Sequence, residues 1–300
     1  GYYTFALAPQ GPLPGEPCGN GVMTMTVSKN GIVRFAGTLA DGTAVSMASY
    51  ASLEGDLSNP KTCMLWVPLW ATSSAYSLGG VVRLVFDDSD SDVKAVYVPT
   101  YETKLEWAKD GASSTYDGAG FRLSLLPAGG WYDTVVNLQR YYLSNAFTVE
   151  TEPVTGIPEY LRYPGLAYSI DSTPHGVEAL LNGNELSPVA TSFVMDGRRF
   201  DLAKSLNPWG VQFSFNRGNG LVSGTFKIIT DNGSDPQGYA ATLTHKGVLL
   251  MNCDPKSTLV DLLTAGFYLM PSSKNGWQIS RPFNIRATAV DPDWSEAELR

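Results

Sequence analysis

The sequence is poor in charged residues and in histidine, and both shortages narrow the functions open to it. Charged residues make up 17% of the 300 residues, below the roughly 25% of average soluble domains. Only two histidines are present, His175 and His245. A Ser-His-Asp triad needs a base beside its nucleophile, and the chain has no Gly-x-Ser-x-Gly segment. We therefore expect His175 in a loop and His245 on the surface beside a turn at Lys246-Gly247.

Cysteine is also scarce, with Cys18, Cys63 and Cys253 as the complete set. An odd count leaves at least one thiol outside any intramolecular disulfide. A Cys18–Cys63 bridge and three reduced, buried thiols are both compatible with the sequence. The spacing of the three residues does not match a zinc site, and without a Cys/His motif thiol catalysis is not expected.

Long apolar runs and net positive charge are absent as well. No stretch approaches the 18 or so apolar residues of a membrane-spanning helix, so we expect no transmembrane segment. The net charge of −8 repels phosphate backbones, which argues against a nucleic-acid partner. The chain begins at Gly1 without an export signal, so we expect any such signal to have been removed or never included. Low charge with abundant Gly, Ser, Thr and aromatic residues favours an extracellular or cell-surface β protein.

One phrase occurs twice, as NGIVRFAGTL at residues 30–39 and as NGLVSGTF at residues 219–226. Each copy follows a strand-like alternating segment, and Asn-Gly favours a two-residue hairpin turn because both residues tolerate positive φ. Asp41-Gly42 and Asp196-Gly197 predict further hairpins. Glycine inside a strand marks a bend or a close approach, so we predict that Gly37 and Gly224 lie at strand bends facing the core.

The pattern of short alternating segments and turns predicts an all-β fold with less than about 10% helix. We expect two consecutive antiparallel β-meander units, barrel-like or sandwich-like, at residues 1–133 and 134–300. A short helical turn is expected from Ser257 to Leu263. The predicted strands cover 2–7, 22–28, 32–39, 44–50, 64–70, 80–86, 94–99, 121–126, 146–150, 167–170, 190–195, 198–202, 211–215, 221–229, 239–245, 247–251, 265–270 and 277–285.

Several of these segments resemble a β module that recurs in large surface or secreted bacterial proteins of the verrucomicrobial kind. The resemblance is carried by the strands and turns of 24–43, by Trp66-Val67-Pro68-Leu69-Trp70, and by the segments 220–226, 245–250 and 265–269. It implies an exported, bacterial, repeat-bearing protein with no assigned activity. The shared motifs are structural, so the resemblance transfers no catalytic residue to this chain.

Trp66 and Trp70 are the candidate ligand-binding residues, because residues four apart on a strand share a face. Exposed indoles stack on sugars, and large aromatic rings also fill β cores. The opposite face carries Leu65, Val67 and Leu69, which makes it the better candidate for the interior. This arrangement leaves the tryptophan face available for a glycan.

Asp88, Asp90 and Asp92 are the candidate metal ligands, because alternating carboxylates on a loop are how calcium sites begin. The segment lacks the central glycine and the distal glutamate of an EF-hand, so a solvated hairpin turn is the simpler interpretation. Calcium is the only cofactor that the sequence suggests.

The sequence favours a non-catalytic structural or adhesion module, with another surface protein or a glycan as partner. The alternative is a carbohydrate-binding module that uses the Trp66 and Trp70 face. A glycoside-active enzyme is third: it needs two carboxylates across a cleft, for which Glu102, Glu106 and Asp110 are available.

Overall fold

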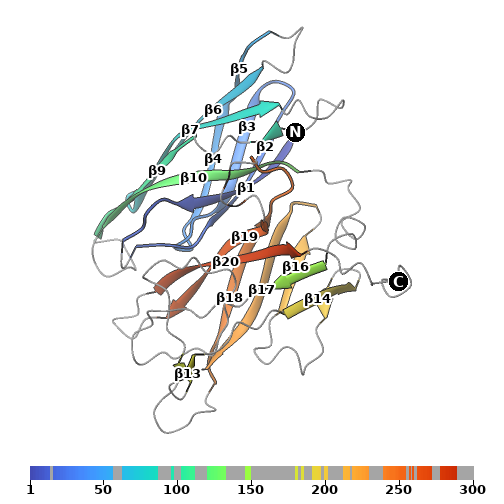
Figure 1. Cartoon of the computed structure of the whole chain (residues 1–300). Helices are drawn as coiled ribbons and strands as arrows, with labels where there is room; N and C mark the ends of the chain where they lie inside the picture. Colours follow the sequence, from blue (N-terminus) through green and yellow to red (C-terminus); the bar gives the residue numbers. More distant parts are fainter. Residues whose placement is uncertain are drawn as a thin grey trace.

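The computed structural model shows a chain built from β-strands in two parts, one above the other in Figure 1. It describes residues 1–13, 16–56, 63–86, 96–97, 103–111, 120–132, 146–149, 180–181, 184–185, 191–196, 199–201, 212–216, 218–229, 239–254, 257, 259, 262–271 and 278–288. These residues contain no α-helix, and hence no helix of the length and apolarity needed to cross a membrane. The predicted all-β class is confirmed.

The first part is a curved, ten-stranded antiparallel sheet, called the first sheet below. Its main path runs β4-β3-β2-β1-β10-β8-β7-β6-β5, and β9 pairs with both β10 and β7. The strands are β1 (Tyr2–Pro9), β2 (Gly21–Val27), β3 (Ile32–Thr38), β4 (Ala44–Tyr50), β5 (Ser52–Glu54), β6 (Met64–Thr72), β7 (Tyr76–Phe86), β8 (Val96–Tyr97), β9 (Leu105–Lys109) and β10 (Phe121–Trp131).

The second part is a closed barrel in the order β11-β14-β15-β16-β17-β18-β19-β20, with a separate pair of short strands, β12 and β13. The strands are β11 (Ala146–Val149), β12 (Leu180–Leu181), β13 (Asn184–Glu185), β14 (Thr191–Asp196), β15 (Arg199–Asp201), β16 (Gln212–Asn216), β17 (Leu221–Ile229), β18 (Tyr239–Leu249), β19 (Leu262–Pro271) and β20 (Gln278–Thr288). The two strand systems fall on either side of the predicted boundary near Asp133, which stays a prediction.

The hairpins at Asn30-Gly31 and Asp41-Gly42 form as predicted, but each loop is one residue longer than predicted. Ser28 N–H donates to Ile32 O, and Gly31 N–H donates back to Ser28 O, which leaves three residues in the loop. Leu39 and Thr43 repeat this pattern around Gly42, with φ of 73° at Gly31 and 87° at Gly42. A three-residue hairpin needs a left-handed residue only at its last position. The Asn therefore does not have to share the positive φ.

Two other local predictions were wrong. Lys246-Gly247 is not a turn, because β18 runs through it and Gly247 pairs with Val222 on one side and Gly266 on the other. The predicted helical turn that ends at Leu263 overlaps β19, which begins at Leu262. In both places partner strands decide the conformation, and a single segment does not reveal its partners.

The inner face of the first sheet holds the core of this part. Phe5, Met23 and Gly37 lie side by side on β1, β2 and β3, and Trp107 packs edge-on against Phe121 from β9 and β10. Gly37 faces inward as predicted, because a Cβ built on it would collide with Val22 O and with Met23. The side chain of Met23 occupies the space that a side chain at position 37 would need.

The outer face of β1 and β2 packs against the barrel, and we call this contact the joint. Val248, Ala265 and Phe267 on the outer barrel face belong to the same hydrophobic cluster as the core of the first sheet. Thr4 Oγ1 donates to Leu249 O at 2.6 Å, and Asn20 N–H donates to Gly266 O at 3.0 Å. The two parts are therefore joined by apolar packing and by hydrogen bonds.

The first sheet curves until β4 faces β6. The two strands do not form a hydrogen-bonded ladder; the Ser49 hydroxyl donates instead to the carbonyl oxygen of Pro68. We call this meeting of two edges the seam. Proline has no N–H, so at this residue β6 offers only an acceptor to its neighbour.

Candidate functional site

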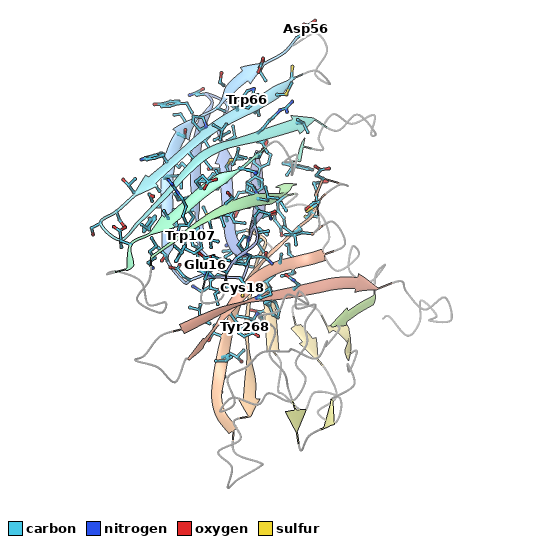
Figure 2. All side chains as sticks on the ribbon, turned by 60° about the vertical axis from the view of Figure 1, so that its left-hand side comes forward. Glu16, Cys18, Asp56, Trp66, Trp107 and Tyr268 are labelled. Carbon is cyan, nitrogen blue, oxygen red and sulfur yellow. The ribbon has the colours of Figure 1, made fainter. Side chains whose placement is uncertain are left out.

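The predicted aromatic face lies on the outside of β6, far from the barrel, where Figure 2 labels Trp66. Val67 and Leu69 point inward and are buried, so the aliphatic face is the interior one. The indole of Trp70 is 72% exposed. Trp66 is half-buried: its Nε1–H donates to Glu54 Oε2 at 2.7 Å, and the guanidinium of Arg83 lies 5.3 Å from its ring centroid. Trp70 is the more accessible of the two rings.

The strands next to Trp70 place a glycine and then a carboxylate on the same outer face. Trp70 pairs with Gly79 on β7, Gly79 pairs with Glu106 on β9, and Glu106 pairs with Ser124 on β10. The indole covers Gly79 so closely that a Cβ there would collide with it. The Ser124 hydroxyl donates to Glu106 Oε1 at 2.7 Å, which fixes the carboxylate beside the ring. A flat apolar ring next to an oriented acceptor is suited to a sugar, whose rings have apolar faces and hydroxyl edges.

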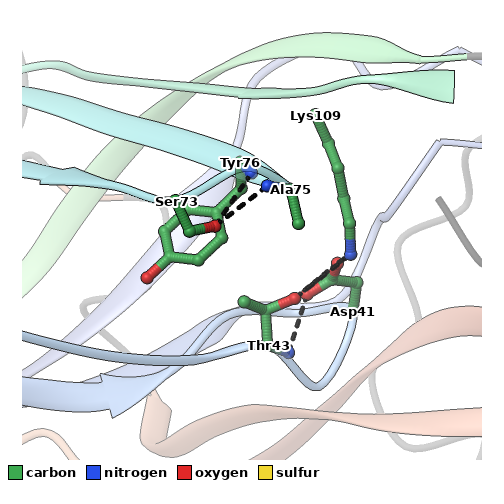
Figure 3. A network of polar contacts seen from close by, with 6 residues as sticks. All are labelled: Asp41, Thr43, Ser73, Ala75, Tyr76 and Lys109. Carbon is green, nitrogen blue, oxygen red and sulfur yellow. Dashed lines mark hydrogen bonds and ion pairs between the residues drawn. The ribbon is translucent and has the colours of Figure 1, made fainter. Parts of the chain in front are cut away.

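An ion pair ties the Asp41-Gly42 hairpin to the middle of the first sheet (Figure 3). Lys109 Nζ lies 2.6 Å from Asp41 Oδ2 and 3.2 Å from Thr43 Oγ1, and both charged side chains are buried. Asp41 also accepts hydrogen bonds from the backbone and hydroxyl of Thr43 at 2.9 Å. The neighbouring turn is held by Ser73, whose Oγ accepts from Ala75 N–H and Tyr76 N–H. The charged and hydroxyl groups of Asp41, Thr43 and Lys109 bind one another, which indicates a structural role for this cluster.

The predicted calcium ligands Asp88, Asp90 and Asp92 lie outside the described residues, as do His175 and Glu102. Within the described part of the chain no group of three or more His, Cys, Asp or Glu side chains could hold a metal ion. The calcium hypothesis stays a prediction. The pair of catalytic carboxylates that a glycoside-active enzyme needs also stays a prediction.

His245 is not the surface residue that the sequence predicts. It is fully buried inside the barrel, where its ring stacks on Phe283 with 3.8 Å between centroids and 17° between planes. Gly224 pairs with it on β17, so the second predicted inward glycine also lies on an interior position. The sequence signal was the alternation Leu243, His245, Gly247, which continues the inward face of β18 through the apparent turn.

All three cysteines are reduced. Cys18 lies where the first sheet meets the barrel (Figure 2), and its thiol donates to Ser280 O at 2.9 Å. Cys63 donates to Asp56 O at 3.3 Å, so the Cys18–Cys63 bridge is not formed. Burial, with a smaller contribution from the negative charge of Asp254, raises the pKa of the Cys253 thiol to about 12. A thiol with so high a pKa is a poor nucleophile at neutral pH.

The sequence did not reveal a groove between the first sheet and the barrel, which apolar and polar groups line together. It has a volume of about 550 Å³ and lies between the outer faces of β2 and β3 and those of β16, β17 and β18. The two copies of the repeated phrase meet here, with Ala36-Gly37-Thr38 on one wall and Leu221-Val222-Ser223 on the other. Its hydroxyl, amide and ammonium groups come from residues that are far apart in the sequence, so no local motif marks it.

Comparison of the chain with protein-family models, with curated proteins and with solved structures finds no match.

Proposed function

We propose that this chain is a non-catalytic structural or adhesion module of an exported or cell-surface bacterial protein. The observation that supports this most directly is the joint, where one hydrophobic cluster runs from Phe5 in the first sheet to Phe267 in the barrel. A spacer that carries load needs its parts to act as one body, and continuous apolar packing couples their unfolding.

Calorimetry of the full chain tests this proposal. We expect one unfolding transition whose calorimetric and van't Hoff enthalpies agree, as for any single cooperative unit. Val248→Glu places a charge in the joint, where Val248 is fully buried, and should split the transition in two. Thr242→Glu is the matched control, because Thr242 lies on the same face of β18 but is exposed. Two transitions in the parent protein would contradict the proposal.

A second candidate function is carbohydrate binding by the outer aromatic face, and the exposed Trp70 indole beside Glu106 favours it. An indole that rests on Gly79 is already ordered, so a ligand that stacks on it has little side-chain entropy to overcome. The overall negative charge of the chain also favours a neutral polysaccharide over an acidic one at this open face.

Pull-down on insoluble neutral polysaccharides, such as cellulose, xylan and chitin, tests the second candidate. Trp70→Ala should abolish retention, and Trp66→Ala should reduce it less because Glu54 and Arg83 already cover that ring. Tyr50→Ala is the control, since Tyr50 is an equally exposed aromatic residue at 72% on β4. Retention that is equal in the Trp70 and Tyr50 variants would refute this role for the face.

A further inference from the structure

We propose that the groove between the first sheet and the barrel binds an acidic oligosaccharide through the ammonium group of Lys246. This site is separate from the Trp70 face, and it adds a ligand to the module beyond the scaffold role. Its volume of about 550 Å³ is within the range of ligand pockets.

The groove lies beside the joint, between the outer face of the first sheet and the outer face of the barrel. Phe267 is buried in the joint, and its cross-strand neighbour Lys246 is exposed on β18. Beyond Lys246 the same row continues to Ser223 on β17 and Ser214 on β16. Opposite this row are Thr24 and Thr38 on β2 and β3. The polar row therefore begins where the apolar packing of the joint ends.

Two side-chain amides and one ammonium group give the groove hydrogen-bond donors, while the Thr24 and Ser214 hydroxyls already donate to Ala36 O and Ser223 O. Asn216 Oδ1 accepts from Gly218 N–H at 3.0 Å, and Asn219 Oδ1 accepts from Leu221 N–H at 3.0 Å. Because backbone N–H groups can only donate, these bonds fix both amide orientations and leave the two NH₂ groups as donors. The Tyr2 hydroxyl donates a hydrogen bond to Asn219 O at 3.0 Å. A ligand with acceptor groups can bind these amide and ammonium donors.

Among the described residues that line the groove, Lys246 is the only one with a charged side chain, and it forms no ion pair with another described residue. An ammonium group that can approach a carboxylate gains a charge-assisted hydrogen bond, which is stronger than a neutral one.

The same lining distinguishes a saccharide from other anions. Val22, Ala36 and Leu221 place apolar groups between the hydroxyls and amides, which suits a sugar ring with apolar faces and polar edges. A nucleic acid would bring many phosphates toward an acidic protein with one free cation in the groove. An acidic peptide would bring charge without the hydroxyl edges. A uronate oligomer fits the donors, the apolar groups and the single cation together.

Titration calorimetry with trigalacturonate, on the full chain, tests this inference. We expect binding that weakens about tenfold or more in Lys246→Gln, the loss that one charge-assisted hydrogen bond implies. Lys29→Gln is the matched control, because Lys29 is exposed in the β2–β3 hairpin and lies outside the groove. Binding of neutral galactotriose should be much weaker than that of the acid.

Three outcomes would overturn the proposal: no heat of binding with trigalacturonate, equal losses in the Lys246 and Lys29 variants, or a triglutamate peptide that binds as tightly as the uronate. Ser223→Ala is a second variant with an unchanged net charge, and it should weaken binding without altering the thermal transition. The calorimetric test of the joint does not depend on any of these results, so failure here leaves the scaffold proposal standing.

Discussion

The outer face of the first sheet is built differently where it meets the barrel and where it meets solvent. At the joint, β1 presents Thr4, Ala6 and Ala8, all buried beneath the barrel. At the opposite side of the same face, β6 presents Pro68 and Trp70, both exposed. Small side chains allow a second layer to come close, whereas a large ring keeps its own surface open. The joint side of this face therefore holds the molecule together, whereas the β6 side is open to solvent.

The largest effect should come from the barrel side of the joint. Phe267→Ala removes a buried ring from the shared cluster and should lower the free energy of unfolding by about 3 to 5 kcal/mol. Urea unfolding of the full chain measures it, with Leu13→Ala as the control because Leu13 is 65% exposed. A loss below about 1 kcal/mol would mean that the joint is loosely packed and does not hold the two parts together.

Overpacking of the inner face should have the next largest effect. Gly37→Val places a branched side chain where Met23 already lies, and should cost about 1 to 3 kcal/mol. Gly224→Val is expected to act similarly inside the barrel, opposite His245. Thermal melts measure both, beside Gly218→Ala in an exposed turn. Melting within about one degree of the parent, far less than such a loss implies, would show that the space is not filled.

A single hydrogen bond across the joint should contribute less. Thr4→Val keeps the shape of the side chain but removes the donor to Leu249 O, and should cost about 1 kcal/mol. Thr26→Val on β2 is the matched control, because Thr26 is exposed. Equal urea midpoints for the two variants would show that the hydrogen bond at Thr4 does not stabilise the joint.

The smallest effect on stability should come from the open side of the face. Trp70→Ala should change the free energy of unfolding by no more than about 0.5 kcal/mol, because the ring is exposed and covers only Gly79. Trp107→Ala, at a fully buried position on the same sheet, is the contrasting variant. A loss for Trp70 as large as that for Trp107 would show that Trp70 stabilises the fold, and would argue against its proposed role in binding.

The fold class and most strands could be predicted because alternation and turn residues are local signals. The same reasoning identified Val67 and Leu69 as inward residues and left Trp70 outside. It failed at His245, since Lys246-Gly247 has the composition of a turn, and only the partners Val222 and Gly266 keep it extended. It also missed the groove, whose walls are more than 170 residues apart in the sequence at Thr38 and Ser214. A single sequence holds no local signal for such pairings.

The seam between β4 and β6 has a consequence for crowding. Free strand edges can recruit strands from other molecules, which leads to fibres and aggregates. Here two edges of one sheet face each other. Pro68 has no N–H, so β6 lacks a backbone donor at this residue, and the edge strand β5 is only three residues long. Such a sheet offers little free edge on which a strand of another molecule could pair. Neighbouring copies at high density would then stay separate, each keeping its outer faces free.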